Sequence, residues 1–492
     1  MKFLGLNISI SRESEPGVIK PTKRVELSGQ YDPAEIGGIG GAWLRDLVGY
    51  YALMFAYENS QTPKQGIGKW LLLALLTFFT NQLAAQEWTR FHGPNGTGIG
   101  QMKNFPAKIS DGAINWKIEL PGSGHSSPVL WGDKLFLTCT GDRAGGMSVL
   151  CLSAKDGKVE WKQDFGLTPF PRHQYNSFAS STPTVDGHRV YVVWNEREHY
   201  MLGALDHTGK TVWQRDFGPF VSQHGCGVSP VLCDDKVILT DFQDDPDFVE
   251  GPISDTRTGK SSILAVDAKT GKTVWQTPRK STVVTYSTPC LYEANGKRTL
   301  VFCSQSHGIF ALDPNNGEPI WEYKQAFDKR TVSSPMIAGN MILGSCGNGA
   351  GRNSVTAIRP PVSGQAPELA YQIKKSAPYV PTGIVMNDLV WLWSDGGILT
   401  CASASSGEVR YQERVGGNYF GSPVCADGRI FCVSSSGELV VVEASDKFKV
   451  LDRYPLGELC RSTPALALGR LFVRTEKHLW SFGASTETTK TE

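Results

Sequence analysis

The stretch Ile263–Gln276, ILAVDAKTGKTVWQ, reads as a strand, a tight turn and a second strand. Alternating aliphatic residues lead to Asp267, whose carboxylate can accept a local backbone N–H. Gly271 can adopt the left-handed conformation that closes such a turn without steric cost. The β-prone run that follows ends at Trp275, which offers a large apolar surface to a neighbouring element. We therefore expect a hairpin with an aromatic residue at a fixed position in its second strand.

Related phrases recur along the chain, each with an aromatic residue four positions after a glycine. The glycines are Gly157, Gly209, Gly271, Gly317 and Gly407, and their aromatics are Trp161, Trp213, Trp275, Trp321 and Tyr411. A shared spacing places each aromatic at the same register of the strand that follows the turn. The pattern predicts structural repeat positions, and a self-similar period is the first sign of a repeat fold.

A second phrase alternates with the first, and it consists of a small hydroxyl residue followed by proline. Its copies are Ser127-Pro128, Thr182-Pro183, Ser229-Pro230, Thr288-Pro289, Ser334-Pro335, Ser422-Pro423 and Thr463-Pro464, with a degenerate copy at Pro381-Thr382-Gly383. Proline lacks an N–H and is tolerated at the first position of a strand. The copies recur on average every 48 residues. A period near this value, with four strands per unit, is typical of propeller blades.

Eight opening phrases are matched by eight strands that carry an aromatic residue. These aromatics are Trp116, Trp161, Trp213, Trp275, Trp321, Tyr371, Tyr411 and Tyr454. The first such strand, Asn115–Leu120, precedes the first opening phrase, whereas the last phrase is followed only by strands at Arg470–Arg474 and His478–Phe482. Pairing the N-terminal strand with the last blade would leave no free sheet edge. We predict an all-β, eight-bladed β-propeller closed in this way.

The N-terminal region has the pattern of a targeting signal. Lys64 and Lys69 precede the apolar run Trp70–Phe79, and small residues follow up to Ala85. This arrangement is typical of a secretory signal peptide, and the run is short for a bilayer span. An uncleaved anchor and a buried helix are the alternatives. The expected division is a leader over 1–68 with Met54 as an alternative start, a signal peptide over 69–86, the propeller over 87–483 and a polar tail over 484–492.

Composition excludes several classes of partner and site. The formal net charge of +1 provides no field to attract nucleic acid. Eleven cysteines occur without a CxxC spacing, so no zinc site is expected, and most of them fit buried core thiols. The sequence does not decide whether Cys139 and Cys151 form a disulfide. We interpret the acidic segment Asp241–Glu250 as a solvated loop, with a Ca²⁺ site as the alternative.

The copies AVDAKTGKTVW and ALDHTGKTVW resemble the tryptophan-docking repeat of pyrroloquinoline-quinone (PQQ) dehydrogenase propellers, and equally that of BamB-like propellers, which lack the quinone. Trp88–Gly100, WTRFHGPNGTGIG, is similar to the opening of exported PQQ-like repeat proteins, which are common in Planctomycetes. The resemblance covers about residues 87–483 and implies a fold more than an activity. In the dehydrogenases the quinone lies over a vicinal disulfide beside Ca²⁺, but this chain has no adjacent cysteine pair and no matching calcium ligands.

Candidate ligand-binding residues come from the propeller topology. The loop before each innermost strand opens near the central channel, so residues just ahead of the opening phrases should converge there. The candidates are His125, His173, His224, Tyr286, Arg330, Tyr379, Tyr419 and Arg461. Such a polar and aromatic set suits a small anionic or sugar-like ligand. The structural alternative is that these residues hydrogen-bond neighbouring loops.

The expected function is that of an exported, periplasmic or secreted scaffold without catalytic residues. It would bind an envelope protein or a small polar ligand through its loops, as a monomer without a cofactor or metal and without a transmembrane span in the mature chain. No HExxH or GxSxG motif is present, and no nucleophile–base pair is indicated. The alternative is a PQQ- and Ca²⁺-dependent dehydrogenase or a quinone-binding sensor, as the first resemblance implies.

Overall fold

The structure, a computed structural model, describes residues 2–3, 6–13, 22–28, 87–102, 105–106, 108–140, 146–168, 170, 172–249, 255–361 and 365–483. The chain divides into two compact units, Met1–Ala84 and Ala85–Glu492. In the first unit, an antiparallel sheet of order β1-β2-β3 is formed by Lys2–Phe3, Leu6–Glu13 and Thr22–Ser28. The predicted signal peptide and polar tail lie outside the described residues.

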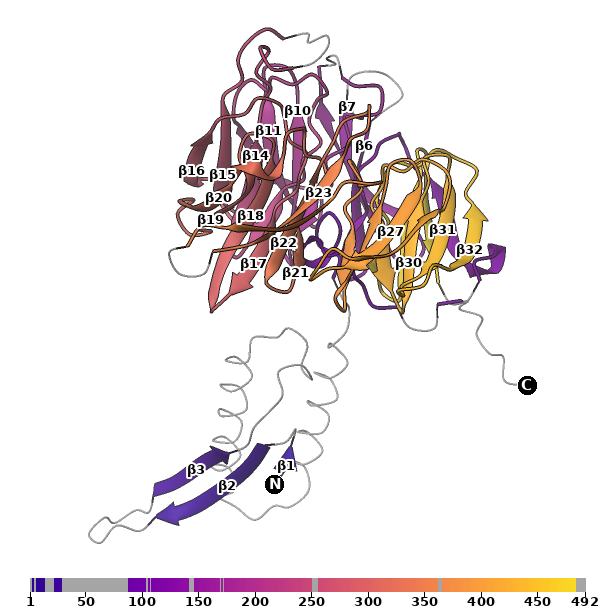
Figure 1. The fold of residues 1–492 in the computed structure, drawn as a ribbon. Coiled ribbons are helices and arrows are strands. Elements are labelled where there is room, and N and C mark those ends of the chain that lie inside the picture. The colour runs from indigo at the N-terminus through magenta and orange to yellow at the C-terminus, as the bar shows by residue number, and fades with distance from the viewer. Residues whose placement is uncertain are drawn as a thin grey trace. The chain divides into compact units, whose positions relative to one another are not determined.

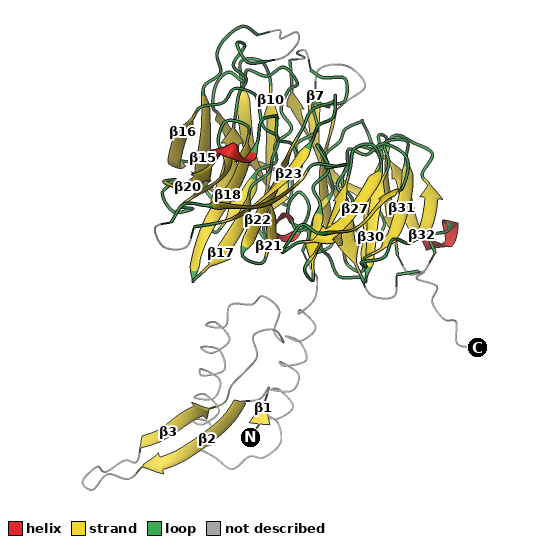
Figure 2. Ribbon diagram, in the orientation of Figure 1, coloured by secondary structure: helices red, strands yellow, loops and turns green. Residues whose placement is uncertain are grey.

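The second unit contains eight four-stranded antiparallel sheets, and Figure 2 shows how strands dominate it. The first four sheets comprise β5–β8 (Val129–Trp131, Lys134–Thr140, Gly146–Ser153, Val159–Gly166), β9–β12 (Thr184–Val185, Arg189–Asn195, Tyr200–Asp206, Thr211–Asp216), β13–β16 (Val231–Cys233, Lys236–Asp241, Ser261–Asp267, Thr273–Arg279) and β17–β20 (Cys290–Ala294, Lys297–Ser304, Gly308–Leu312, Pro319–Tyr323). The next three comprise β21–β24 (Met336–Ala338, Met341–Cys346, Ser354–Arg359, Glu368–Ile373), β25–β28 (Ile384–Met386, Leu389–Trp393, Ile398–Ser403, Val409–Arg414) and β29–β32 (Val424–Ala426, Arg429–Val433, Glu438–Glu443, Val450–Pro455). We number these sheets as blades 1 to 7.

Blade 8 closes the ring. Its strand order is β33-β34-β35-β4, formed by Ala465–Ala467, Arg470–Arg474, His478–Phe482 and Ile114–Glu119. The N-terminal β4 therefore completes the last blade, with Trp116 opposite Ser481. Figure 1 shows purple ribbon from the start of the propeller beside its yellow C-terminal strands. The predicted eight-bladed, all-β propeller and its mode of closure are confirmed.

Helical structure among the described residues is limited to short 3₁₀ turns. They are η2 (Pro94–Gly96), η3 (Asp111–Ala113) and η4 (Lys324–Ala326). A search of the described residues finds no helix with the length and apolar character needed to span a bilayer.

Five of the joints between blades are contacts between an aromatic residue and a glycine turn. Trp213 of blade 2 donates its indole N–H to the carbonyl of Ala268 in blade 3 at 3.1 Å. Gly271 has a φ of +70°, and a Cβ added there would lie 2.7 Å from the Trp213 ring. Only glycine leaves room for this ring. The same arrangement joins Trp116 to Gly157, Trp161 to Gly209, Trp275 to Gly317 and Tyr371 to Gly407.

The hydroxyl residues of the opening phrases form buried hydrogen bonds across every blade boundary except that between blades 3 and 4, and we call this set the hydroxyl ring. Thr382 accepts the N–H of Ser334 on Oγ1 and donates its own N–H to Ser422 Oγ, both at 2.9 Å. Thr463 donates to Ser127 Oγ at 3.0 Å, which links the last blade to the first. Further bonds of this type run from Ser127 to Thr182, from Thr182 to Ser229, from Thr288 to Ser334 and from Ser422 to Thr463. The hydroxyl groups thus bind neighbouring inner strands together.

The segment Trp88–Gly100 lies across the inner strands of several blades. The carbonyl of Trp88 accepts the N–H of Leu130 in blade 1, and the buried Arg90 donates to the carbonyl of Pro289 in blade 4 at 2.7 Å. His92 Nε2 lies 2.8 Å from the carbonyl oxygen of Pro423 in blade 7. These partners follow the hydroxyl ring along their strands, whereas the candidate residues precede it. The segment and the candidate residues are therefore on opposite sides of the ring.

The cysteines and the acidic segment test two further expectations. All eleven cysteines are free and buried, which confirms core thiols and gives no disulfide between Cys139 and Cys151. The solvated interpretation of Asp241–Glu250 is wrong for its first four residues, 241–244, which are all buried. Asp241 and Asp244 are buried, because they are hydrogen-bonded to loop groups around them.

Candidate functional site

The loops that precede the inner strands form one face of the propeller, which we call the loop face. Tyr175, ahead of blade 2, packs against Phe420, ahead of blade 7, with ring centroids 5.2 Å apart. The guanidinium of Arg461, ahead of blade 8, lies 5.0 Å from the Tyr175 ring and 5.6 Å from the Phe420 ring. Since blades 2 and 7 are not neighbours, the Tyr175 loop reaches across the ring of blades.

The histidines converge next to this aromatic pair. The rings of His173 and His224 lie 4.8 Å apart, and Tyr175 lies 5.1 Å from His173. Asn176 donates to the carbonyl of His224 at 2.6 Å, so the loop ahead of blade 2 is tied to that ahead of blade 3. Tyr286, ahead of blade 4, donates its hydroxyl to the carbonyl of Gly225 at 3.1 Å. The loops ahead of blades 2, 3 and 4 are thereby held together.

The guanidinium groups of the loop face carry positive charge that nearby carboxylates neutralise only in part. Arg330 lies 3.7 Å from Asp244, but that carboxylate already accepts backbone N–H groups of Gln223 and Val284, each at 2.6 Å. Arg461 has no ion pair with any described residue. The Nε atoms of Arg330 and Arg461 are buried and have no hydrogen-bond partner among the described residues. The loop face therefore carries excess cationic donors.

A third arginine lies beneath the loops. Arg474 on β34 is fully buried and donates to the carbonyl and hydroxyl of Ser126 at 3.0 and 2.6 Å. Its other terminal nitrogen lies 3.4 Å from Cys139 Sγ. The groups that contact Arg474, Ser126 and Cys139, are neutral. The positive charge of Arg474 is therefore not cancelled by a carboxylate and also acts on the loop face.

These cations and burial keep the imidazoles neutral. Burial, followed by the charge of Arg330, lowers the pKa of His224 to about 4. Burial, followed by Arg474 and Arg461, lowers the pKa of His125 to about 3. The pKa of His173 is also lowered, first by burial and then by Arg330 and Arg461. At neutral pH the arginines alone carry the charge.

The two remaining tyrosine candidates lie in different environments. The backbone N–H of Tyr379 donates to Asp395 at 2.6 Å, and burial raises the pKa of its phenol. Tyr419 is fully buried and packs against Trp393 at 5.0 Å, inside a blade core. Its neighbour Phe420 takes the position toward Tyr175. The structure brings seven candidates to the loop face and places the ring of Tyr419 below it.

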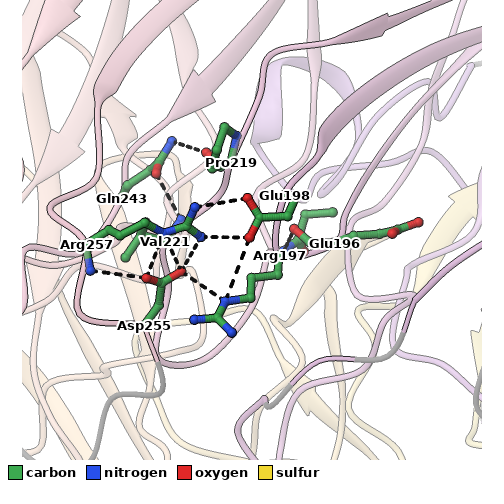
Figure 3. Close-up of polar contacts among 9 residues, drawn as sticks. Glu196, Arg197, Glu198, Pro219, Val221, Gln243, Asp255 and Arg257 are labelled. Atoms are coloured by element: carbon green, nitrogen blue, oxygen red, sulfur yellow. Dashed lines mark hydrogen bonds and ion pairs between the residues drawn. The ribbon is translucent and has the colours of Figure 1, made fainter.

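A set of ion pairs fixes the loops beside this region (Figure 3). Arg257 binds Glu198 at 3.0 and 3.2 Å and Asp255 at 2.9 and 2.5 Å. Gln243 accepts the N–H of Val221 and donates to the carbonyl of Pro219. The charged groups of this network pair with one another. The network therefore holds the β10–β11 and β14–β15 loops together.

Sequence reasoning missed several contributors to the loop face. Phe420 stands one residue nearer to its opening phrase than Tyr419, and Asp244 lay in the segment interpreted as solvated. Arg474 is an ordinary strand residue in the sequence, with no motif to mark it. The one signal in the sequence that could have indicated Phe420 is its position two residues before Ser422-Pro423.

The acidic side chains of the loop face are engaged in contacts with neighbouring loops. No group of three or more His, Cys, Asp or Glu side chains is placed to hold a metal within the part of the chain that the structure describes. Asp244 and Asp395 accept backbone N–H groups on both carboxylate oxygens. Each of these oxygens therefore already accepts one hydrogen bond that holds a loop in place.

Known proteins share this architecture. BamB from Moraxella catarrhalis superposes with a TM-score of 0.54 at 15% identity, covering 76% of this chain and 98% of that protein. Quinohemoprotein alcohol dehydrogenase ADHIIG from Pseudomonas putida HK5 superposes with a TM-score of 0.55 at 12% identity, covering 82% of this chain and 81% of that protein. At these identities the likeness shows the fold alone.

Sequence relatives include two polyvinylalcohol dehydrogenases. That of Sphingopyxis sp. (strain 113P3) is 23% identical over 203 residues, which is 39% of this chain and 28% of the relative. That of Pseudomonas sp. is 25% identical over 167 residues, which is 33% of this chain and 24% of the relative. The matched part thus spans about a quarter of each relative's length.

A family model described as outer membrane protein assembly factor BamB matches residues 106–243, 148–413 and 374–450. These matches overlap and together run through most of the propeller, from β4 into β32. The chain therefore belongs to the family of the outer membrane protein assembly factor BamB, as an eight-bladed propeller of PQQ-like repeats.

Proposed function

We propose that this protein is an exported, non-catalytic propeller scaffold that binds a protein partner or a small ligand through its loop face. The observation that carries the proposal is the convergence of Tyr175, Phe420 and Arg461 from three separate blades, with cationic donors left over. Loops on a rigid scaffold are where binding residues concentrate. Membership of the BamB family supports a protein as the partner.

The proposed mature chain consists of the propeller over 87–483 and the polar tail over 484–492, is exported to the periplasm or beyond by the signal peptide over 69–86, and is monomeric. The basic flank and apolar run of that segment support export. Closure of the ring by β4 supports the propeller boundaries, because this strand belongs to blade 8.

The test of this proposal is capture of a partner from envelope extract by the tagged protein. The double variant His125→Ala/His224→Ala removes two loop-face side chains and should fold normally but lose the captured partner or ligand. His188→Ala, at an exposed turn before β10, is the matched control and should bind as wild type does. Unchanged capture by the double variant would refute the loop face as the binding site.

The second candidate function is a PQQ- and Ca²⁺-dependent dehydrogenase or a quinone-binding sensor. The polyvinylalcohol dehydrogenases among the relatives favour it. The oxygens of Asp244 and Asp395, each of which already accepts a hydrogen bond, weigh against it, so we place it second.

A further inference from the structure

We infer that the ligand of the loop face bears carboxylates, and that the Arg461 guanidinium, which packs against both the Tyr175 and the Phe420 ring, is its main anchor. This inference rests on the proposed function, because it names the chemistry recognised at the same face. The carboxylates can belong to a small polycarboxylate or to acidic side chains of a protein, and the experiment below separates these two sources.

The first step is how Arg461 is held. Its guanidinium lies 5.0 and 5.6 Å from two aromatic centroids, and it forms no ion pair within the described chain. Aromatic faces stabilise a cation without using its N–H groups. Burial of Nε without a partner is costly, and a ligand oxygen would remove that cost. A guanidinium oriented in this way can bind a planar carboxylate through two parallel hydrogen bonds.

The second step is a neighbouring cation. The Arg330 side chain is 13% exposed, and its only carboxylate neighbour in the described chain, Asp244, accepts two short backbone hydrogen bonds as well. Arg330 and Arg461 both act on His173, so their fields overlap at that imidazole. A ligand with more than one carboxylate would engage both arginines.

The third step is access. Tyr175 is 46% exposed, so the face of the aromatic pair reaches solvent beside the charge. Arg172, on the same loop, is exposed and lies 4.7 Å from the Phe178 ring. Cationic donors next to an exposed ring favour an anion with an apolar part.

The experiment is calorimetric titration of the full chain with citrate, a hexaglutamate peptide, inorganic phosphate and a hexalysine peptide. We expect citrate or hexaglutamate to bind, and higher salt to weaken this binding. Arg461→Gln should weaken it about tenfold or more. Arg414→Gln, which removes the same charge from the exposed end of β28, is the matched control and should leave it unchanged.

A second pair of variants keeps the test valid if Arg461→Gln unfolds, which thermal unfolding would reveal. Tyr175→Ala removes one of the two rings and should weaken binding several-fold, whereas Tyr175→Phe keeps the ring and should restore wild-type affinity. Binding of citrate alone identifies a small ligand as the source, and binding of hexaglutamate alone identifies a protein segment.

The inference is overturned if the folded wild type binds neither carboxylate probe, if it binds only phosphate or hexalysine, or if Arg414→Gln weakens binding as much as Arg461→Gln does. Its failure differs from that of the proposed function. A captured partner that tolerates Arg461→Gln contradicts the inference alone. Retained PQQ with Ca²⁺-dependent dye reduction, in a protein that still binds carboxylates through Arg461, contradicts the proposed non-catalytic function alone.

Discussion

Glycine and tryptophan positions carry the blade joints at the scale of single residues. Gly271 and Gly296 have φ values of +70° and +71°, so alanine would be strained equally at both. An added Cβ meets Trp213 at 2.7 Å in the first case and no atom within 4 Å in the second. The two sites therefore separate backbone strain from blade docking.

We predict that Gly296→Ala lowers the free energy of unfolding by about 1–2 kcal/mol, the cost of a left-handed alanine. Gly271→Ala should cost about 1–3 kcal/mol more, because the methyl group displaces the Trp213 ring. Urea denaturation of both variants checks this difference. Equal losses would show that the glycine–tryptophan contact does not join the blades.

The same contact shows what the sequence could not provide. The spacing predicted that Gly271 turns the chain and that Trp275 docks on another sheet. The partners were not predictable, because a repeat does not say which neighbour a side chain faces. Trp275 docks at Gly317 of the next blade, and Gly271 receives Trp213 from the preceding one.

His92 makes stability depend on pH. Burial, the main cause, lowers its pKa from 6.5 to about 4, so protons bind the unfolded chain more strongly. This contribution is complete above about pH 6.5 and is lost as the pH falls toward 4. His125 and His224 act in the same direction. Asp241 acts oppositely, because burial raises its pKa to about 7 and its contribution declines between about pH 4 and 7.

We therefore predict that the free energy of unfolding rises from pH 4.5 to pH 7, because the histidines whose pKa is lowered outnumber the acids whose pKa is raised, Glu87, Asp241 and Asp395. His92→Gln keeps a donor for one backbone carbonyl but cannot titrate, so the rise should be smaller in this variant. Denaturant titrations of both proteins at the two pH values measure it. An unchanged rise would mean that His92 is not held neutral in the folded state.

At the scale of elements, the hydroxyl ring organises the inner strands. Thr382→Val keeps the shape of the side chain but leaves the buried N–H of Ser334 without its acceptor. We predict a loss of about 1–3 kcal/mol in unfolding free energy. Thr382→Ser keeps the hydroxyl and should lose clearly less. If the serine and valine variants are equally destabilised, the hydroxyl does not bind the strands.

The opening phrases illustrate partial predictability of an element. The sequence-based prediction used the proline of each opening phrase to mark the start of a strand. It assigned no role to the hydroxyl residue that precedes the proline. The degenerate copy reveals which residue matters, since Thr382 keeps its hydrogen bonds where Gly383 replaces proline. A Cβ on Gly383 would lie 2.6 Å from the carbonyl oxygen of Trp391. Contacts of this kind depend on packing between strands that sequence spacing does not contain.

The loops show the same limit at the candidate site. Position relative to an opening phrase placed His173, His224 and Arg461 correctly on the loop face. It failed at Tyr419, because adjacent residues point to opposite sides and Phe420 takes the outward place. Arg474 reaches the region from within β34, which a loop-based prediction could not include.

At the scale of the whole molecule, counting the opening phrases was enough to predict the fold. Eight opening phrases and a spare N-terminal strand determined both the number of blades and the closure through β4. Function did not follow, because propellers of this kind include BamB and quinone enzymes, and the blades of both are built alike. The distinction depends on side chains that a few loops bring together.

The most direct test of the non-catalytic assignment is to incubate the purified protein with PQQ and Ca²⁺, remove unbound quinone by desalting, and measure absorbance and dye reduction with alcohols or sugars. A scaffold whose Asp244 and Asp395 oxygens already accept backbone N–H groups should retain no quinone and reduce no dye. Retained quinone together with Ca²⁺-dependent dye reduction would contradict the scaffold function.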